Sequence, residues 1–218
     1  MAASRLTTND WLGGDRLFSP LGFEPGYDYP LLVWLPDHTG SEPFDLGRTM
    51  KRVSLRNFVA VEPAADGDPS DHDAREQAVW RAIDRVRDRI AIHPDRIYLV
   101  GQAAGGSAAF RIACRHPQAF GGVVSLGGPF PLDEGLFSRL FEVRRLPMLL
   151  CCNASHSVAA AHHTDRTLRL FHAAGASLAM RIYPGRKHCS KAILGDVNRW
   201  LMDEICGASV PMRPACAR

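Results

Sequence analysis

Short apolar runs that alternate with amphipathic helical patterns constrain the fold of this chain more than any other feature of its sequence. The runs at 31–35 and 97–100 lack the polar alternation of a half-exposed strand, which is typical of strands buried on both faces of a sheet. Similar runs occur at 58–61, 123–126, 148–152 and 178–183. Helical patterns lie between them, over 74–90, 105–115, 164–174 and 191–205. This order predicts an α/β protein with a mostly parallel central sheet and helices on both faces.

The chain is long enough to fold as one such domain without a disulfide or a metal. It has 218 residues, of which 46% are hydrophobic and 22% are charged, the balance of an ordinary globular protein. A domain of this size can bury most of its unfolded surface. No internal repeat or low-complexity linker interrupts the sequence, so we predict a single domain over residues 1–206. The tail at 207–218 consists largely of small residues and proline, and we expect it to be disordered.

Composition and charge argue against several classes of function. The net charge is only +3, and the arginine-rich stretches also carry acidic residues, so no basic face for nucleic acid is expected. No apolar run reaches the ~20 residues of a membrane span, and residues 1–10 lack the apolar core of a secretion signal. The 6 cysteines show no zinc or disulfide spacing, which favours a reducing, cytoplasmic setting.

A glycine-bounded turn follows the run at 97–100 and leads directly into a helical pattern. Its sequence over 101–106 is GQAAGG. A strand, a sharp turn and a helix form the setting of the nucleophile elbow, Gly-x-Ser-x-Gly, in which the serine attacks a substrate carbonyl. Here the central residue is Ala103, which has no lone pair for attack and no hydroxyl for a base to activate. The glycines and the context of the motif are present, and its nucleophile is not.

Four segments of the chain together resemble the phospholipase/carboxylesterase branch of the α/β-hydrolases. They are YPLLVWL at 29–35, the turn at 101–106, SLGG at 125–128 and YPGRKH at 183–188. Their order within residues 15–206 implies an α/β-hydrolase fold. The resemblance also implies positions for the catalytic residues.

At the triad positions that this resemblance implies, only the base is retained. His188 follows the last predicted strand, where the family has its base. The family acid follows the preceding strand in a Gly-x-x-Asp motif, and the matching stretch at 153–156 places His156 at the acid position. A neutral imidazole can accept a hydrogen bond from the base but cannot stabilise an imidazolium as a carboxylate does. With Ala103 at the nucleophile position, the implied triad is degenerate.

The oxyanion-hole region also departs from the family pattern. The family has His-Gly after its first buried strand, whereas this chain has a proline followed by Asp37 and His38. The resemblance places the hole at Asp37, His38 and Ala104, where a fixed carboxylate would oppose the negative charge of the transition state. We expect Gln102 and Phe130 to contact a ligand in the same pocket.

These substitutions favour a protein that no longer hydrolyses esters. Loss of a triad serine lowers turnover by roughly 10⁶, and further losses within the triad add little. Changes at nucleophile, acid and oxyanion loop together are better explained by a natural pseudoenzyme than by one weakened site. We therefore expect the protein to bind a small acyl- or ester-type ligand or a protein partner, without a cofactor. The oligomeric state stays open at this point.

Two other functions stay open from the sequence. A working hydrolase would need another nucleophile, for which Ser107 and Cys189 are the candidates. Such an enzyme could also hold a metal with His38, His156, His188 and Asp37, but no His-x-x-x-His spacing supports this and we predict no metal site. Alternatively, the fold serves as a structural or assembly subunit, for which a large exposed apolar patch is expected.

Overall fold

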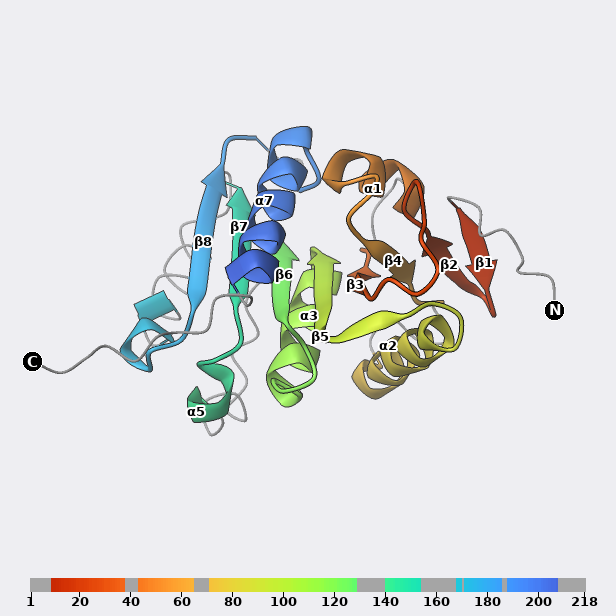
Figure 1. The fold of residues 1–218 in the computed structure, drawn as a ribbon. Helices are drawn as coiled ribbons and strands as arrows, with labels where there is room; N and C mark the ends of the chain where they lie inside the picture. The colour runs from red at the N-terminus through yellow and green to blue at the C-terminus, as the bar shows by residue number, and fades with distance from the viewer. Residues whose placement is uncertain are drawn as a thin grey trace, which may run out of the picture.

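A computed structural model describes residues 9–37, 43–64, 71–128, 140–153, 168–169, 171–185 and 188–207. Within these residues, 8 strands form one sheet in the order β1-β2-β4-β3-β5-β6-β7-β8 (Figure 1). Their bounds are β1 Asp10–Leu12, β2 Asp15–Phe18, β3 Tyr29–Leu35, β4 Val59–Glu62, β5 Ile92–Gln102, β6 Gly122–Leu126, β7 Met148–Asn153 and β8 Leu178–Tyr183. The pairs β1–β2 and β2–β4 are antiparallel, and the other neighbours are parallel. The predicted mostly parallel sheet is therefore confirmed.

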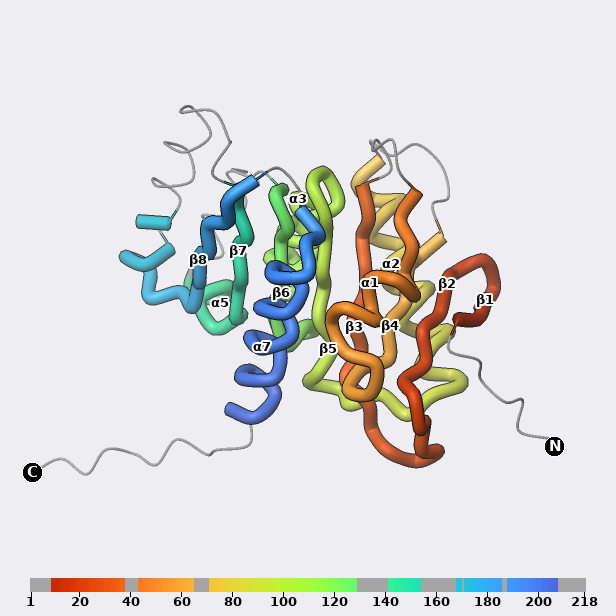
Figure 2. Tube along the Cα trace, turned by 90° about the horizontal axis from the view of Figure 1, so that it is seen from above, coloured from red at the N-terminus to blue at the C-terminus, as the bar shows by residue number. Residues whose placement is uncertain are grey.

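Helices cover both faces of the sheet, as the sequence predicts. On one face lie α1 (Leu46–Val53) and α7 (Lys191–Gly207), which are side by side in Figure 2. On the other face lie α2 (His72–Arg87), α3 (Ala104–Arg115) and the short α5 (Leu140–Val143). No helix in the described part of the chain combines the length and the apolar character that crossing a membrane requires.

The uninterrupted apolar runs of the sequence form the central strands. All residues of β3, β4 and β6 are buried. Along β3, Leu31 and Val33 belong to the core under α2 and α3, whereas Leu32 and Trp34 belong to the core under α1 and α7. Because both sets of side chains are covered, a polar side chain at either position is costly to bury, which explains why the sequence shows no polar alternation.

The sequence analysis missed the antiparallel edge of the sheet and one helix. Strands β1 and β2 have only 3 and 4 residues, too few to show a period, and α1 has only 8. β5 begins at Ile92, five residues before the predicted start, so residues taken as a break after α2 are already in the strand. α7 ends at Gly207, which the sequence analysis placed in the tail, and residues 208–218 lie outside the described residues.

The register brings the carboxyl ends of β3, β5, β6 and β7 to one edge of the sheet. Leu35 pairs with Gly101, Gln102 with Leu126, and Leu126 with Cys151. In open α/β sheets, ligands bind outside the carboxyl ends of the strands. The residues that follow these four strand ends therefore form the candidate site.

Candidate functional site

The turn between β5 and α3 has the backbone of a nucleophile elbow. Ala103 has φ 47° and ψ −118°, and it is the one non-glycine residue with a positive φ among the described residues. Its N–H donates to the carbonyl of Leu126 at 2.9 Å, and its own carbonyl accepts from the N–H of Gly106 at 2.9 Å. A positive φ for an L-residue stores roughly 1–3 kcal/mol of strain, which the surrounding packing must hold. The elbow conformation is therefore present although the attacking group is absent.

Close packing explains why the turn is bounded by glycines. A Cβ on Gly105 would overlap the carbonyl oxygen of Leu35, so the start of α3 lies directly against the end of β3. A Cβ on Gly106 would overlap Oγ of Ser125, which lies beneath the helix on β6. Ser125 is fully buried, and its hydroxyl has no hydrogen-bond partner within the described residues. It belongs to the packing under the elbow and is not accessible to a substrate.

His188 is held above the end of β6. Gly127 follows this strand with φ 72°, and a Cβ there would overlap the imidazole ring of His188. The absence of a side chain at Gly127 therefore provides the space that the ring occupies. Because Ala103 donates to Leu126, the residue before Gly127, His188 and the elbow lie at neighbouring strand ends.

The partner of His188 Nδ1 is Asn153, the last residue of β7. The two nitrogen atoms, Asn153 Nδ2 and His188 Nδ1, lie 3.0 Å apart, and Asn153 is only 5% exposed. The sequence analysis did not single out Asn153, because the resemblance matches it to the glycine of Gly-x-x-Asp. The signal that could have found it is an amide side chain directly at the end of a buried strand, where a glycine is expected.

The loop that carries His188 is attached to the elbow and to α1. Cys189 Sγ donates to Oε1 of Gln102 at 3.3 Å, and Nη1 of Arg52 donates to the carbonyl of Cys189 at 3.4 Å. Burial raises the pKa of the Cys189 thiol to about 12. Since the thiolate is the nucleophilic form, this cysteine fits a structural role rather than a catalytic one. Gln102, expected to contact a ligand, thus also contacts the loop that carries His188.

Asp37 lies in a positively charged surrounding. Burial lowers the pKa of the Arg75 guanidinium, Arg111 lowers it further, and the carboxylate of Asp37 raises it. The negative charge of Asp37 is therefore opposed by Arg75 on α2. Ala104, the other described residue of the expected oxyanion hole, is exposed and begins α3.

Three of the predicted site residues, His38, Phe130 and His156, lie outside the described residues. Gln102 and Ala103 are adjacent at the elbow, the neighbour of His188, Cys189, contacts Gln102, and His188 itself lies against Gly127 at the next strand end. Among the residues that the structure describes, no group of three or more histidine, cysteine or acidic side chains is arranged to hold a metal ion.

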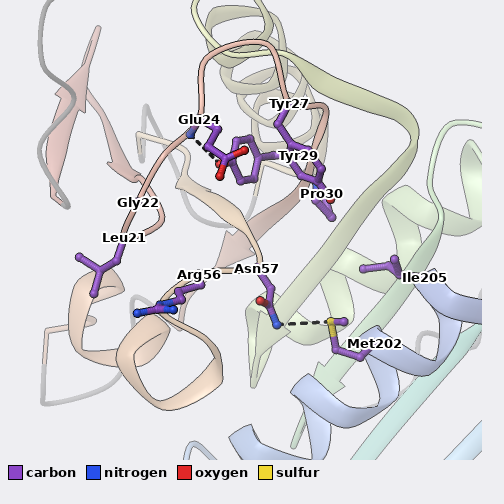
Figure 3. Close-up of a pocket in the computed structure, with 10 residues that line it drawn as sticks. All are labelled: Leu21, Gly22, Glu24, Tyr27, Tyr29, Pro30, Arg56, Asn57, Met202 and Ile205. Atoms are coloured by element: carbon purple, nitrogen blue, oxygen red, sulfur yellow. Dashed lines mark hydrogen bonds between the residues drawn. The ribbon is translucent and has the colours of Figure 1, made fainter.

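A groove of about 540 Å³ lies away from the carboxyl ends of the strands, at the end of the sheet where β3 begins and α7 ends (Figure 3). Its walls include Tyr27, Arg56 and Met202, and Nδ2 of Asn57 donates to Sδ of Met202 at 3.5 Å. The elbow follows the carboxyl ends of the strands, so the groove and the candidate site are separate features.

Known proteins resemble this chain over a short segment of sequence and, over most of its length, in fold. No family model matches the chain. A segment of 61 residues is 34% identical to a protein named as an esterase, NocK of Nocardia uniformis subsp. tsuyamanensis. This segment covers 28% of the chain and 18% of NocK, so the match concerns a small part of that protein.

Similar solved structures cover most of the chain. A thermostable esterase has a TM-score of 0.66 at 17% identity, covering 87% of this chain and 58% of its own. A ferulic acid esterase has a TM-score of 0.69 at 15% identity, and the match covers 87% of this chain and 92% of the esterase. Esterase 2 of Thermogutta terrifontis has a TM-score of 0.64 at 12% identity and covers 91% of both chains. The chain therefore has the α/β-hydrolase fold, as the resemblance implies.

Proposed function

We propose that this protein is a catalytically inactive, carboxylesterase-like pseudoenzyme that binds a small acyl- or ester-type ligand at the carboxyl ends of β5, β6 and β7. The observation that carries the proposal is Ala103 at φ 47° in an intact elbow. The strained turn is retained without the hydroxyl that it serves to present in an ester hydrolase. This combination supports a site whose shape is kept and whose chemistry is lost.

The arrangement around His188 supports the same conclusion. The ring is held by Gly127 and Asn153, and its loop is tied to Gln102, so the base position is kept in place. An amide beside Nδ1 supplies no negative charge to stabilise an imidazolium. A missing nucleophile alone lowers turnover by roughly 10⁶, which leaves no useful hydrolysis at this site.

No observation favours a replacement nucleophile. Burial raises the pKa of the Cys189 and Cys151 thiols to about 12, so neither supplies a thiolate near neutral pH. Ser125 is fully buried, and the N–H of Ser107 donates to the carbonyl of Ala103 within the first turn of α3. The Ser107 position is thus part of the first turn of α3 that the elbow starts.

An assembly role is not favoured by the described surface either. The most exposed large apolar side chains of the described residues are Trp11, Phe141 and Ile182. They belong to β1, α5 and β8, and β1 and β8 are the two opposite edges of the sheet. These three lie on separate elements, and the less exposed Leu21 and Tyr27 both line the groove of Figure 3, whereas a large assembly interface presents one contiguous apolar patch.

The test combines turnover and binding of 4-nitrophenyl butyrate. We expect no hydrolysis above a heat-treated control, and saturable binding that shifts the NMR signals of Gly127 and His188. Tyr27→Ala, in the groove of Figure 3, is the control and should leave binding unchanged. Hydrolysis that survives His188→Gln, or binding that Tyr27→Ala abolishes, would contradict the proposal.

A further inference from the structure

The groove of Figure 3 has three walls that come from distant parts of the chain. They are the segment from the end of β2 to the start of β3, the turn after α1, and the end of α7. The N–H of Leu21 donates to the carbonyl of Leu55 at 2.7 Å, which joins the first two walls. The N–H of Tyr29 donates to the carbonyl of Ala91 at 3.0 Å, which holds the first wall to the sheet. The groove is therefore preformed, and its volume of about 540 Å³ is ordinary for the site of a small ligand.

Exposed apolar side chains gather at this groove. Leu21 and Tyr27, which line it, are 45% and 51% exposed, and the exposed Leu55 precedes Arg56 on the second wall. The ring of Tyr27 meets the ring of the buried Tyr29 edge to face, with 4.7 Å between the ring centroids. Tyr27 therefore offers a supported aromatic surface that a ligand can cover.

The groove also carries one negative and one positive side chain. Glu24 belongs to the same wall as Tyr27, and Arg56 belongs to the turn after α1 (Figure 3). Among the residues that the structure describes, neither the Glu24 carboxylate nor the Arg56 guanidinium has an ion-pair or hydrogen-bond partner. Beside Arg56, Nδ2 of Asn57 donates to Sδ of Met202 at 3.5 Å, and a thioether is a weak acceptor. The polar groups of the groove are therefore available to a ligand that carries both charges.

We propose that the groove binds a short zwitterionic peptide, with its ammonium group at Glu24 and the Tyr27 ring and its carboxylate at Arg56. A carboxylate and an aromatic face on the same wall both attract a cation, and a guanidinium pairs with a carboxylate through two hydrogen bonds. Asn57 adds an amide donor beside the carboxylate, and Leu21 supplies apolar contact between the two ends. A neutral ester would cover both charges without pairing either. The groove is separate from the elbow, so this inference does not depend on the proposed function.

The first test compares three probes by isothermal titration calorimetry. Leucyl-leucine carries both charges, its N-acetyl derivative lacks the ammonium group, and leucyl-leucinamide lacks the carboxylate. An ion pair between exposed groups changes affinity by about fivefold at most. We expect leucyl-leucine to bind and each derivative to bind more weakly by about that factor. Equal affinity for the three probes, or binding of none, would overturn the inference.

The second test assigns each charge of the peptide to its residue. Glu24→Gln should weaken leucyl-leucine about fivefold and leave the affinity for the N-acetyl derivative unchanged. Arg56→Gln should do the same with the amide derivative as the insensitive probe. Tyr27→Phe should preserve binding and Tyr27→Ala should weaken it, because the ring and not the hydroxyl makes the contact.

Asp28→Asn is the matched control, because it removes the same charge beside Tyr27 from a residue that does not line the groove. The side chains of Glu24, Asp28 and Arg56 are exposed, so these variants should keep the fold. Equal losses in Asp28→Asn and Glu24→Gln would overturn the inference, since they would reflect only the general charge of the surface. Competition between 4-nitrophenyl butyrate and leucyl-leucine would also overturn it, because both would then occupy one site.

Discussion

On the proposed function, a working triad at this site requires two substitutions, and the contact between Asn153 and His188 indicates a position for its acid. We predict that Ala103→Ser combined with Asn153→Asp hydrolyses 4-nitrophenyl esters, whereas Ala103→Ser alone does so very slowly. The hydroxyl that Ala103→Ser introduces would take the position from which an elbow presents its nucleophile, because the φ of 47° is already in place. The carboxylate that Asn153→Asp introduces would accept from His188 Nδ1–H across the 3.0 Å that now separates Asn153 Nδ2 from this atom.

The magnitude follows from this distance. A carboxylate 3.0 Å from a protonated ring nitrogen attracts it by about 5.5 kcal/mol at an effective dielectric constant of about 20. This energy corresponds to about 10⁴ in rate, which is also the loss on replacing a triad aspartate by asparagine in a serine protease. Asn153 is 5% exposed, so solvent screens little of the interaction.

The assay is the initial rate of 4-nitrophenyl butyrate hydrolysis above the pH at which the ring becomes neutral. The comparison set contains Ala103→Ser, the double variant with Asn153→Asp, and a double variant with His156→Asp at the acid position that the sequence implies. We expect the Asn153→Asp pair to be about 10⁴-fold faster than Ala103→Ser alone. Adding His188→Gln should abolish the gain.

The result that would refute the reasoning is a folded Ala103→Ser/Asn153→Asp protein with an Nδ1–H ring and less than a tenfold gain. The orientation of His188 would then be insufficient, and the fault would lie in the oxyanion region near Asp37. A gain that appears only with His156→Asp would instead show that Asn153 does not occupy the position of the acid.

Three other substitutions examine the elbow, the glycine beneath the base and a buried carboxyl group. Ala103→Gly relieves the positive φ and should raise the free energy of unfolding in urea by about 1 kcal/mol; a decrease would contradict strain at this turn. Gly127→Ala places a methyl group against the His188 ring at φ 72° and should lower that free energy by about 2 kcal/mol while shifting the ring resonances; unchanged resonances would contradict the contact. Burial raises the pKa of Glu62 from 4.5 to about 7, against the opposing charge of Arg16. The folded protein therefore binds this proton more tightly than the unfolded chain, and stability should fall by about 3 kcal/mol as the pH rises from about 4.5 to about 7. Glu62→Gln should remove this fall, and an identical pH slope in both proteins would count against the shift.

Much of the fold was predictable because buried parallel strands have a strong local signature. β8 matches its predicted bounds at Leu178–Tyr183, and β6 and β7 each differ from the prediction by one residue. Their side chains are covered on both faces, so the apolar run itself marks the strand. The antiparallel pair β1 and β2 was not predictable in this way. Its strands are short, and their stability comes from pairing with β4, far along the chain.

The candidate site likewise has one part that the sequence predicts and one part that it does not. The elbow could be identified from its glycines, since the close approach of α3 to β3 and β6 excludes any side chain at Gly105 and Gly106. The contact of Asn153 could not be identified from the sequence, because no local pattern relates Asn153 to His188, 35 residues later in the chain. Their contact depends on the register that places the ends of β6 and β7 next to each other.

The sequence by itself determined the succession of strands and helices, the intact frame of the elbow and the absence of a nucleophile at Ala103. These features depend on residue type and on neighbours along the chain, and both can be read directly from the sequence. Only the tertiary structure decided which side chains are neighbours. It places the Asn153 amide beside His188 Nδ1, Gly127 beneath the His188 ring, and Arg75 near Asp37. The hydrogen-bonding state of a histidine is set by the atoms within about 3 Å of its nitrogens, and those atoms come from distant parts of the chain.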